Sequence, residues 1–155
     1  MIADDRGNPM LFCKRGIILG DMQQHERAIE DLTEALRLDP DLPLAYRRRG
    51  ELRGELGEYE AAIADFRRAL SLDASSVENH WVWRDLGKAY AEIGKHDAAV
   101  SSYDRSIELW QSMVRRPDPD AVFLRGISNR ALHRYDDAIR DFSSTIEQQP
   151  RAPWG

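Results

Sequence analysis

The chain has 155 residues, 32% of which are charged, a net charge of −5 and a mean hydropathy of −0.60. This composition is typical of a water-soluble chain with room for one compact domain or for four to five repeats of about 34 residues. The acidic balance argues against non-specific nucleic-acid binding. The sequence also lacks an apolar run of the roughly 18 residues that a membrane-spanning helix needs. We therefore expect no nucleic-acid and no membrane partner.

The start of the chain and its cysteine content bear on cellular location. Residues 1–6 lack a basic segment followed by an apolar stretch, so the sequence shows no signal peptide. Cys13 is the only cysteine and has no internal disulfide partner, which fits a reducing compartment. These features predict a cytoplasmic protein.

The spacing of apolar residues predicts eight helices and no strand. In chain order, the expected helices span residues 9–21, 25–38, 43–55, 59–72, 78–92, 96–114, 119–131 and 135–148. Short turns separate the two helices of each pair. Gly57 and Gly94 in these turns suit the left-handed residue that often ends a helix.

Four columns of residues recur with the same separations of 34, 37 and 39 residues, which indicates an internal repeat. Small residues let two helices approach closely, and large residues fill the space beside them. The four columns are Gly16, Gly50, Gly87 and Gly126; Ala28, Ala62, Ala99 and Ala138; Leu32, Phe66, Tyr103 and Phe142; and Ala35, Ala69, Ser106 and Thr145.

The unequal separations locate two insertions between repeats. Three extra residues lie near 75–79, and we expect them to lengthen the fifth helix at its start. Five extra residues lie near 111–118, and we expect them to lengthen the sixth helix and to form a longer connection.

The stretch from Trp83 to Tyr90 reads W-x2-L-G-x2-Y, and the other repeats open with Arg-Gly at Arg15, Arg49 and Arg125. With this opening and the columns above, residues 9–150 resemble the tetratricopeptide-repeat (TPR) family. The resemblance implies an all-α, right-handed α-solenoid of four TPR-like helix pairs, at about residues 9–42, 43–76, 80–113 and 119–150. Residues 1–8 would then be a lead-in, and residues 151–155 a tail.

Members of this family are mostly adaptors, so the resemblance implies a non-catalytic module that binds a peptide or a partner surface in a concave groove. First-helix residues offset from the core-facing columns are expected to line that groove. They are Cys13, Ile17, Arg47, Glu51, Trp81, Arg84, Lys88, Phe123 and Ile127. This mixture predicts an extended peptide with acidic and apolar side chains. A clamp for a chaperone's C-terminal carboxylate is not expected, because Glu51 and Asp85 would repel it.

Residue types that often carry chemistry do not form a reactive set here. His25 and His96 share a turn column with two tyrosines, which favours packing, and no histidine has metal-ligand spacing. Cys13 has no base on its own helix face, so we expect a buried or groove-lining thiol. The basic run 47–49 spreads around its helix and makes no single patch. We expect no enzyme activity, no metal and no cofactor.

Arg53 and Asn129 occupy a column where Leu19 and Tyr90 stand in the other repeats. Two interpretations are open for these polar residues. Either the second and fourth repeats pack more loosely, or the two side chains make a specific polar contact.

The last predicted helix carries an apolar stripe of Ile139, Phe142 and Ile146 that no later helix would cover. Trp154 could fold over it, the end could self-associate, or the chain could have been continuous with more sequence. Two alternatives to the adaptor function follow. One is a self-associating scaffold that forms homo-oligomers through its terminal helices, and the other is a regulatory domain separated from a larger enzyme.

Overall fold

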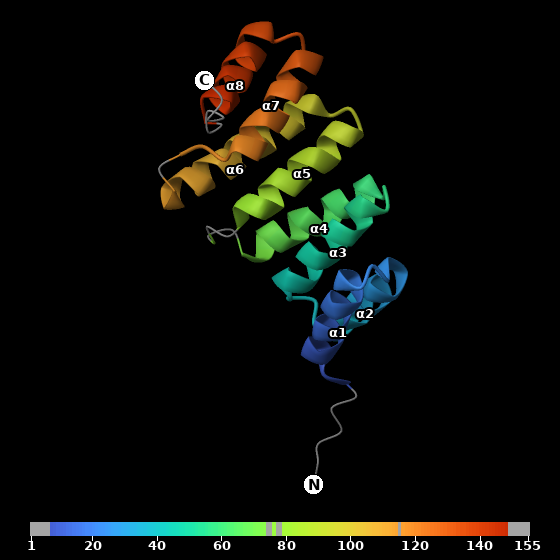
Figure 1. Ribbon diagram of the computed structural model, residues 1–155. Helices are drawn as coiled ribbons and strands as arrows, with labels where there is room; N and C mark the ends of the chain where they lie inside the picture. The colour runs from blue at the N-terminus through green and yellow to red at the C-terminus, as the bar shows by residue number, and fades with distance from the viewer. Residues whose placement is uncertain (1–6, 74–75, 77–78, 115, 149–155) are drawn as a thin grey trace. The chain divides into compact units, whose positions relative to one another are not determined.

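The computed structural model describes residues 7–73, 76, 79–114 and 116–148, and the regular structure in these ranges is helical throughout (Figure 1). The chain divides into two compact units, Met1–Ala74 and Ser75–Gly155, and each unit holds two helix pairs. The predicted all-α fold of four helix pairs is confirmed. The predicted tail 151–155, with Trp154, lies outside the described residues, as do residues 1–6 of the predicted lead-in.

The helices of the first unit make pair one and pair two: α1 (Pro9–Asp21), α2 (His25–Leu38), α3 (Pro43–Glu55) and α4 (Tyr59–Leu72). Those of the second unit make pair three and pair four: α5 (His80–Glu92), α6 (His96–Met113), α7 (Pro119–Ala131) and α8 (Tyr135–Gln148). Six of the eight predicted ranges agree with these bounds at both ends. Proline at the first position of α1, α3 and α7 fits the helix start, where its missing N–H costs no hydrogen bond.

The two insertions have different outcomes. The second lengthens α6 to 18 residues, against 14 in α2, α4 and α8, as predicted. The first does not lengthen α5, which has 13 residues like the other first helices, so that prediction was wrong. Its extra residues precede the helix, where the Asn79 N–H donates to the Ser76 carbonyl in a turn. Because of this turn, α5 begins at His80, two residues later than we expected.

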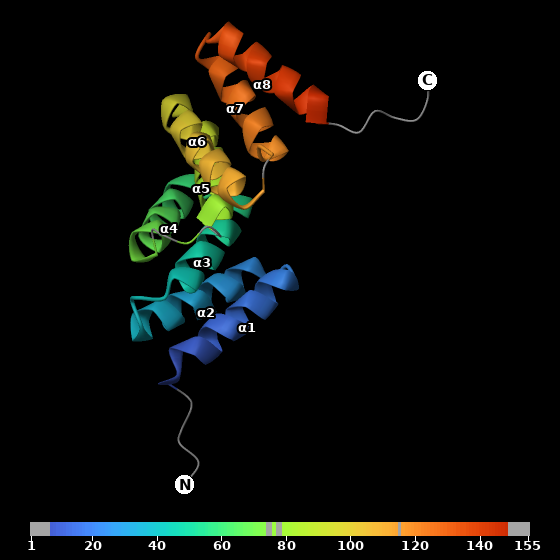
Figure 2. The ribbon, with the colours of Figure 1, turned by 90° about the vertical axis from the view of Figure 1, so that its left-hand side faces the viewer.

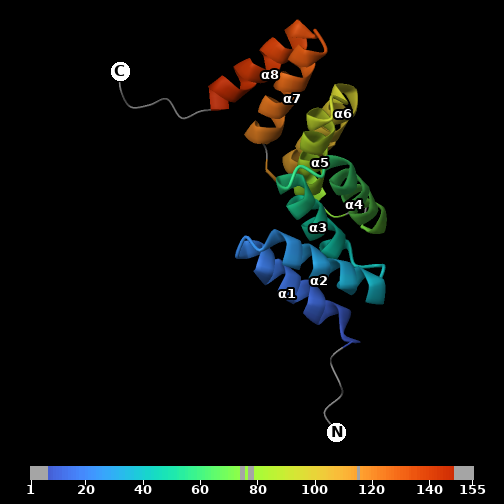
Figure 3. The same ribbon diagram turned by 90° about the vertical axis from the view of Figure 1, so that its right-hand side faces the viewer.

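Each pair closes around its glycine and the bulky residue of the facing helix. A Cβ added to Gly87 would lie 2.5 Å from Cε1 of Tyr103, and one added to Gly50 would lie 2.9 Å from Cε1 of Phe66. Real carbon atoms do not approach so closely, so only glycine permits this contact. Within the first unit α2 also packs on α3, and within the second α6 packs on α7 (Figures 2 and 3).

The turn inside each pair repeats one geometry. Gln23, Gly57, Gly94 and His133 all have positive φ, between 59° and 78°. The residue after each donates to a carbonyl five positions back, as Gln24 does to Leu19 at 2.9 Å and Lys95 to Tyr90 at 2.9 Å. This is the Schellman ending of a helix. The predicted left-handed role of Gly57 and Gly94 is confirmed, and two non-glycine residues adopt it as well.

A bidentate ion pair, which we call the clamp, joins the two helices in three of the four pairs. In each clamp an arginine donates through Nε and Nη2 to an aspartate 16 residues later. The three clamps are Arg15–Asp31, Arg49–Asp65 and Arg125–Asp141, with Nη2–oxygen distances of 2.7, 2.7 and 2.5 Å. All three aspartates are buried. Their burial is tolerable because the paired guanidinium satisfies both carboxylate oxygens.

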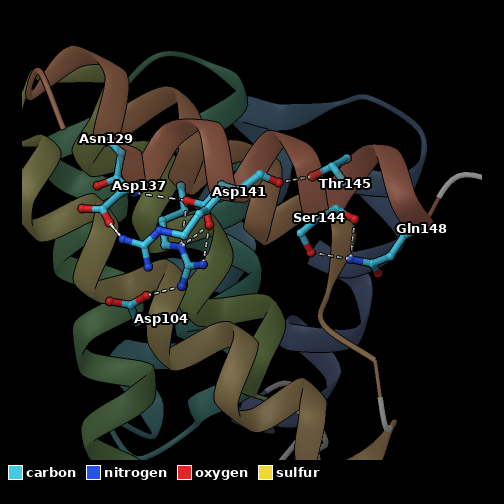
Figure 4. A network of polar contacts seen from close by, with 9 residues as sticks. Asp104, Asn129, Asp137, Asp141, Ser144, Thr145 and Gln148 are labelled. Atoms are coloured by element: carbon cyan, nitrogen blue, oxygen red, sulfur yellow. Dashed lines mark hydrogen bonds and ion pairs between the residues drawn. The ribbon is translucent and has the colours of Figure 1, made fainter. Parts of the chain in front are cut away.

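The two unexplained polar residues complete two of these clamps. Arg53 Nη1 lies 2.7 Å from Oδ2 of Asp65, and Asn129 Nδ2 lies 3.1 Å from Oδ2 of Asp141. Of the two interpretations left open, the specific polar contact is therefore the right one. Figure 4 shows Asn129, Asp141 and Asp104 in the network of pair four.

Pair three has no clamp in these columns. Buried Leu86 stands in the place of the arginine, and buried Ser102 in the place of the aspartate. The Ser102 hydroxyl donates to the carbonyl of Ala98 in its own helix at 2.8 Å. Because the arginine and the aspartate are both absent from pair three, this position holds no unpaired charge.

Candidate functional site

The nine predicted groove residues divide between the two units. Cys13, Ile17, Arg47 and Glu51 lie on α1 and α3 of the first unit. Trp81, Arg84, Lys88, Phe123 and Ile127 lie on α5 and α7 of the second. There are therefore two candidate surfaces, and the two first helices of one unit form each of them.

The first surface contains a small cleft between α1 and α3, with a volume of about 90 Å³. Ile17 and Glu51 line it, together with Arg48, which the sequence reasoning had not placed in the groove. Glu51 lies between two arginines, with its carboxylate 2.9 Å from Arg48 Nη1 and 3.9 Å from Arg47 Nε. These ion pairs fix the side chains along one edge of the cleft.

Cys13 does not reach either surface. It is only 1% exposed and packs in the core cluster with Leu32, Leu36 and Ala45. Burial raises the pKa of the Cys13 thiol, and the nearby Arg48 charge partly offsets that rise. Of the two roles expected for this thiol, the buried one fits, and Cys13 is not part of the candidate site.

The second surface is built around Trp81, whose ring is exposed at the start of α5. The guanidinium carbon of Arg84 lies 4.6 Å from the centroid of this ring, at the distance of a cation–π contact. The Trp110 ring meets it edge-on at a centroid distance of 6.3 Å. Trp81 is thus exposed to solvent and held from two sides.

Arg84 is itself mostly covered, with 13% of its side chain exposed. Its Nη1 lies 3.6 Å from the Asp120 carboxylate and 3.8 Å from that of Asp118, both from the start of α7. Its Nε lies 3.8 Å from the Asp85 carboxylate on its own helix. Arg84 therefore joins α5 to α7 and is already surrounded by negative charge.

The remaining second-surface residues differ in exposure. Lys88 is exposed and pairs with Asp85, with Nζ 2.9 Å from Oδ1. Phe123 is exposed on α7, and its ring contacts Phe142 at a centroid distance of 5.8 Å. Ile127, one turn further along, is half-buried. Phe123 follows Asp120 by three residues, which places both on the same side of α7.

Sequence reasoning missed the contribution of α6 to this surface. Trp110 and His80 stack beside Trp81, with the His80 ring 4.5 Å from Trp81 and 5.0 Å from Trp110. The extra length of α6 carries Trp110 alongside the first turn of α5. The five-residue insertion was the available signal, because it predicted a longer sixth helix but not its new neighbour.

A cavity of about 690 Å³ lies elsewhere in the second unit, among α6, α7 and α8. Acidic and basic side chains line it together. In the described part of the chain each of them has an ion-pair partner: Arg125 with Asp104 and Asp141, Arg140 with Asp137, Arg134 with Asp97, and Glu108 with Arg105. The Asp141 and Asp104 contacts raise the pKa of Arg125, with the Asp141 hydrogen bond contributing most. With these charges already paired, the cavity is a weaker candidate than the exposed aromatic surface.

The described residues contain no helix long and apolar enough to cross a membrane. In the same ranges, no group of three or more His, Cys, Asp or Glu residues is arranged to hold a metal ion.

Solved structures with this fold include several TPR proteins. The crystal structure of MamA has 26% sequence identity and a TM-score of 0.80, covering 92% of this chain and 79% of MamA. YrrB, described as a TPR protein with an unusual peptide-binding site, has 22% identity and a TM-score of 0.81, covering 96% and 73% of the two chains. PilF of Pseudomonas aeruginosa has 17% identity and a TM-score of 0.79, covering 96% and 64%.

Comparison with curated protein sequences found no match. Family models do match, and together they span most of the chain. A model described as TPR repeat matches residues 16–57, and two described as tetratricopeptide repeat match residues 41–112 and 83–153. The glycine and bulky columns, the four helix pairs and these matches agree, and the chain belongs to the tetratricopeptide-repeat family.

Proposed function

We propose that this chain is a non-catalytic protein-interaction module that binds an extended peptide segment on the surface formed by α5 and α7. One observation carries the proposal: Trp81 is exposed, yet Arg84 and Trp110 hold its ring in place. A fixed aromatic ring loses little conformational freedom when a ligand packs on it. Tryptophan and arginine are also the residues that most often dominate binding energy at interfaces.

The fold supports the same class of function without naming a ligand. TPR proteins hold a rigid stack of helix pairs, which presents first-helix side chains at fixed positions. YrrB, which shares the fold, is described as having a peptide-binding site. We extend peptide binding to this chain on the strength of its own exposed aromatic residues, Trp81 and Phe123.

The charge around Trp81 argues against the acidic ligand that the sequence suggested. Arg84 and Lys88 bring two positive charges, whereas Asp85, Asp118 and Asp120 bring three negative ones within 4 Å of them. An acidic peptide gains nothing from cations that carboxylates already neutralise. We therefore propose that an apolar or aromatic side chain of the peptide packs on Trp81, with Phe123 as a second contact.

Selection from a phage-displayed library of random peptides against the full chain tests this proposal. Peptides recovered would be titrated against the parent and against Trp81→Ala and Phe123→Ala, with fluorescence polarisation as the readout. Trp81→Ala should weaken binding at least about tenfold, because it removes the main anchor. Leu56→Ala, which truncates an exposed apolar residue of the first unit, is the matched control and should bind like the parent.

Two results would reject the proposal. One is a library that gives no specific peptide, and the other is a peptide that binds Trp81→Ala as tightly as the parent. Circular dichroism of each variant checks that helicity is retained. Lys88→Glu adds information on charge, since it should change affinity only modestly if the ligand is apolar.

A further inference from the structure

Two helix faces carry exposed apolar side chains that the peptide surface does not use. On α8, Ile139 and Ile146 point away from the pair-four core, and we call them the α8 end face. On α1, Leu11 and Ile18 are exposed, and we call them the α1 end face. Exposed aliphatic residues two turns apart on one helix form an apolar strip along it.

The residues in the column of Ile146 are buried on the other second helices, whereas Ile29 and Val100, in the column of Ile139, are half-buried. With the repeat separations applied, Ile146 corresponds to Leu36 on α2 and to Ile107 on α6. Leu36 packs in one cluster with Ala45 and Leu52 of α3, and Ile107 packs with Ala121 and Val122 of α7. Ile107 is 7% exposed, whereas Ile146 is 70% exposed. In this column the first helix of the following pair provides the cover.

The α1 end face lies in the columns that provide this cover. Leu11 corresponds to Ala45 and Ala121, and Ile18 corresponds to Leu52. Ala45, Ala121 and Leu52 are all buried against the preceding pair. The two exposed faces are therefore the two halves of a contact that the chain already makes between α2 and α3 and between α6 and α7.

The clamp arginines give an independent indication. Besides its bonds to aspartate, Arg49 donates through Nη1 to Thr33 Oγ1 of the preceding pair at 3.0 Å, and Arg125 does so to Asp104 at 2.6 Å. Arg15 makes the same two bonds to its own aspartate, but its Nη1 has no partner among the described residues. Its side chain is 65% exposed, against 13% for Arg49 and 26% for Arg125. In the columns of Thr33 and Asp104, α8 presents exposed Ser143.

We propose that copies of this chain associate head to tail, with the α8 end face of one copy packed on the α1 end face of the next. Arg15 Nη1 of one copy would then donate to Ser143 of the other. The interface is heterologous, because each copy contributes a different face. Leu11 is larger than the alanines in its column, so the helices cannot approach as closely as α2 and α3 do. The association is therefore weaker than the contacts within the chain, and it is reversible and concentration-dependent.

Light scattering after size exclusion, at a series of concentrations, tests the association. The parent should show a mass that rises above 17.8 kDa with concentration. Ile146→Asp blocks one face and Ile18→Asp blocks the other, so each variant alone should stay near 17.8 kDa. An equal mixture of the two should form a complex of two chains, because the intact face of each variant matches the intact face of the other.

The mixture separates the proposed contact from symmetric alternatives. If α8 packed on α8, Ile18→Asp alone would associate like the parent and the mixture would gain nothing, which would overturn the proposal. A parent mass constant at 17.8 kDa would also overturn it. Met113→Asp adds the same charge at an exposed apolar residue of α6 and should leave association unchanged. Ile146→Ser and Ile18→Ser repeat the test with milder changes if either aspartate variant loses helicity.

A gain-of-function variant tests the register. Ser143→Asp copies the Asp104 that Arg125 contacts, so it should give Arg15 of the next copy a carboxylate partner. Association should strengthen by a factor of about two to five, as expected for one exposed ion pair. The added gain should disappear in 1 M salt. Unchanged or weaker association by Ser143→Asp would contradict this register.

Discussion

Pairs three and four belong to the same unit, and each packs a glycine of its first helix against an aromatic ring of its second helix. The side-chain contacts beside this glycine differ between the two pairs. In pair four, Arg125, Asp141 and Asn129 form a charged clamp between α7 and α8. In pair three the clamp columns hold Leu86 and Ser102, and the contact is uncharged. The glycine contact is nevertheless present in both pairs, between Gly126 and Phe142 in pair four and between Gly87 and Tyr103 in pair three. The close approach of two helices therefore does not depend on the clamp, which is a separate and replaceable feature.

The two solutions should differ most when only one partner is changed. Asp141→Ser places in pair four the serine that pair three has in this column, and it leaves the Arg125 guanidinium with Asp104 as its only carboxylate partner. Removing one member of a buried ion pair leaves an uncompensated charge, and we expect the free energy of unfolding to fall by about 3 kcal/mol. Urea unfolding followed by tryptophan fluorescence measures this, because all four tryptophans lie within residues 75–155. A loss below about 1 kcal/mol would mean that the clamp contributes little to pair four.

Introducing both the leucine and the serine of pair three should restore most of the lost free energy of unfolding. The double variant Arg125→Leu with Asp141→Ser removes the charge together with its partner, and an apolar replacement for a buried ion pair is often close to neutral. We expect a cost of about 1 kcal/mol relative to the parent, so the two substitutions should be strongly non-additive. The same fluorescence-detected unfolding, with Arg125→Leu alone as the third corner of the cycle, gives the coupling energy. Additive costs would show that Leu86 and Ser102 depend on other features of pair three.

The sequence predicted the helix pairs and their glycine contacts better than it predicted the clamp. The glycine, alanine and bulky columns share one set of separations, and the helix bounds follow from them. The clamp joins two helices, so helical periodicity within either one does not reveal it. Its signal was the arginine–aspartate spacing of 16 residues, which occurs in three repeats and is lost in the third, where both residues change together.

The candidate site was less predictable for a related reason. First-helix positions could be named from the repeat, but their exposure depends on what packs beside them. Cys13 is covered within the first unit, and Trp81 is held by Trp110 from a helix that an insertion had lengthened. Both facts concern neighbours that differ between repeats, and a pattern shared by all four repeats carries no information about them.

The turns of the same two pairs offer a smaller test. Gly94 in pair three and His133 in pair four share a column and a positive φ, 75° and 59°. A Cβ added to Gly94 meets no atom within 4 Å, so Gly94→Ala tests backbone strain alone and should cost about 1 kcal/mol. His133→Gly relieves that strain but loses the 2.7 Å contact with the Tyr135 hydroxyl, so we expect a gain of no more than about 0.5 kcal/mol. Thermal unfolding of both variants measures the difference, and a destabilising His133→Gly would show that the contact outweighs the strain.

The smallest effect is expected where the clamp is open to water. In pair one Arg15 is mostly exposed, so in Asp31→Ser the freed guanidinium can be hydrated, unlike the more buried Arg125 in pair four. The probe is the Cys13 thiol, which is buried in the same pair. Burial also raises the pKa of this thiol, so it should react slowly with iodoacetamide at pH 8 in the folded parent. Asp31→Ser should raise that rate by a factor of about two to five, through more frequent opening of the pair. A Ser102→Ala variant, which changes the same column in the other unit, is the matched control and should leave the Cys13 rate unchanged. The contrary result would be that Asp31→Ser exposes Cys13 as fully as unfolding does. The clamp would then stabilise pair one as much as pair four, and the exposure of the arginine would not explain a difference between the two pairs.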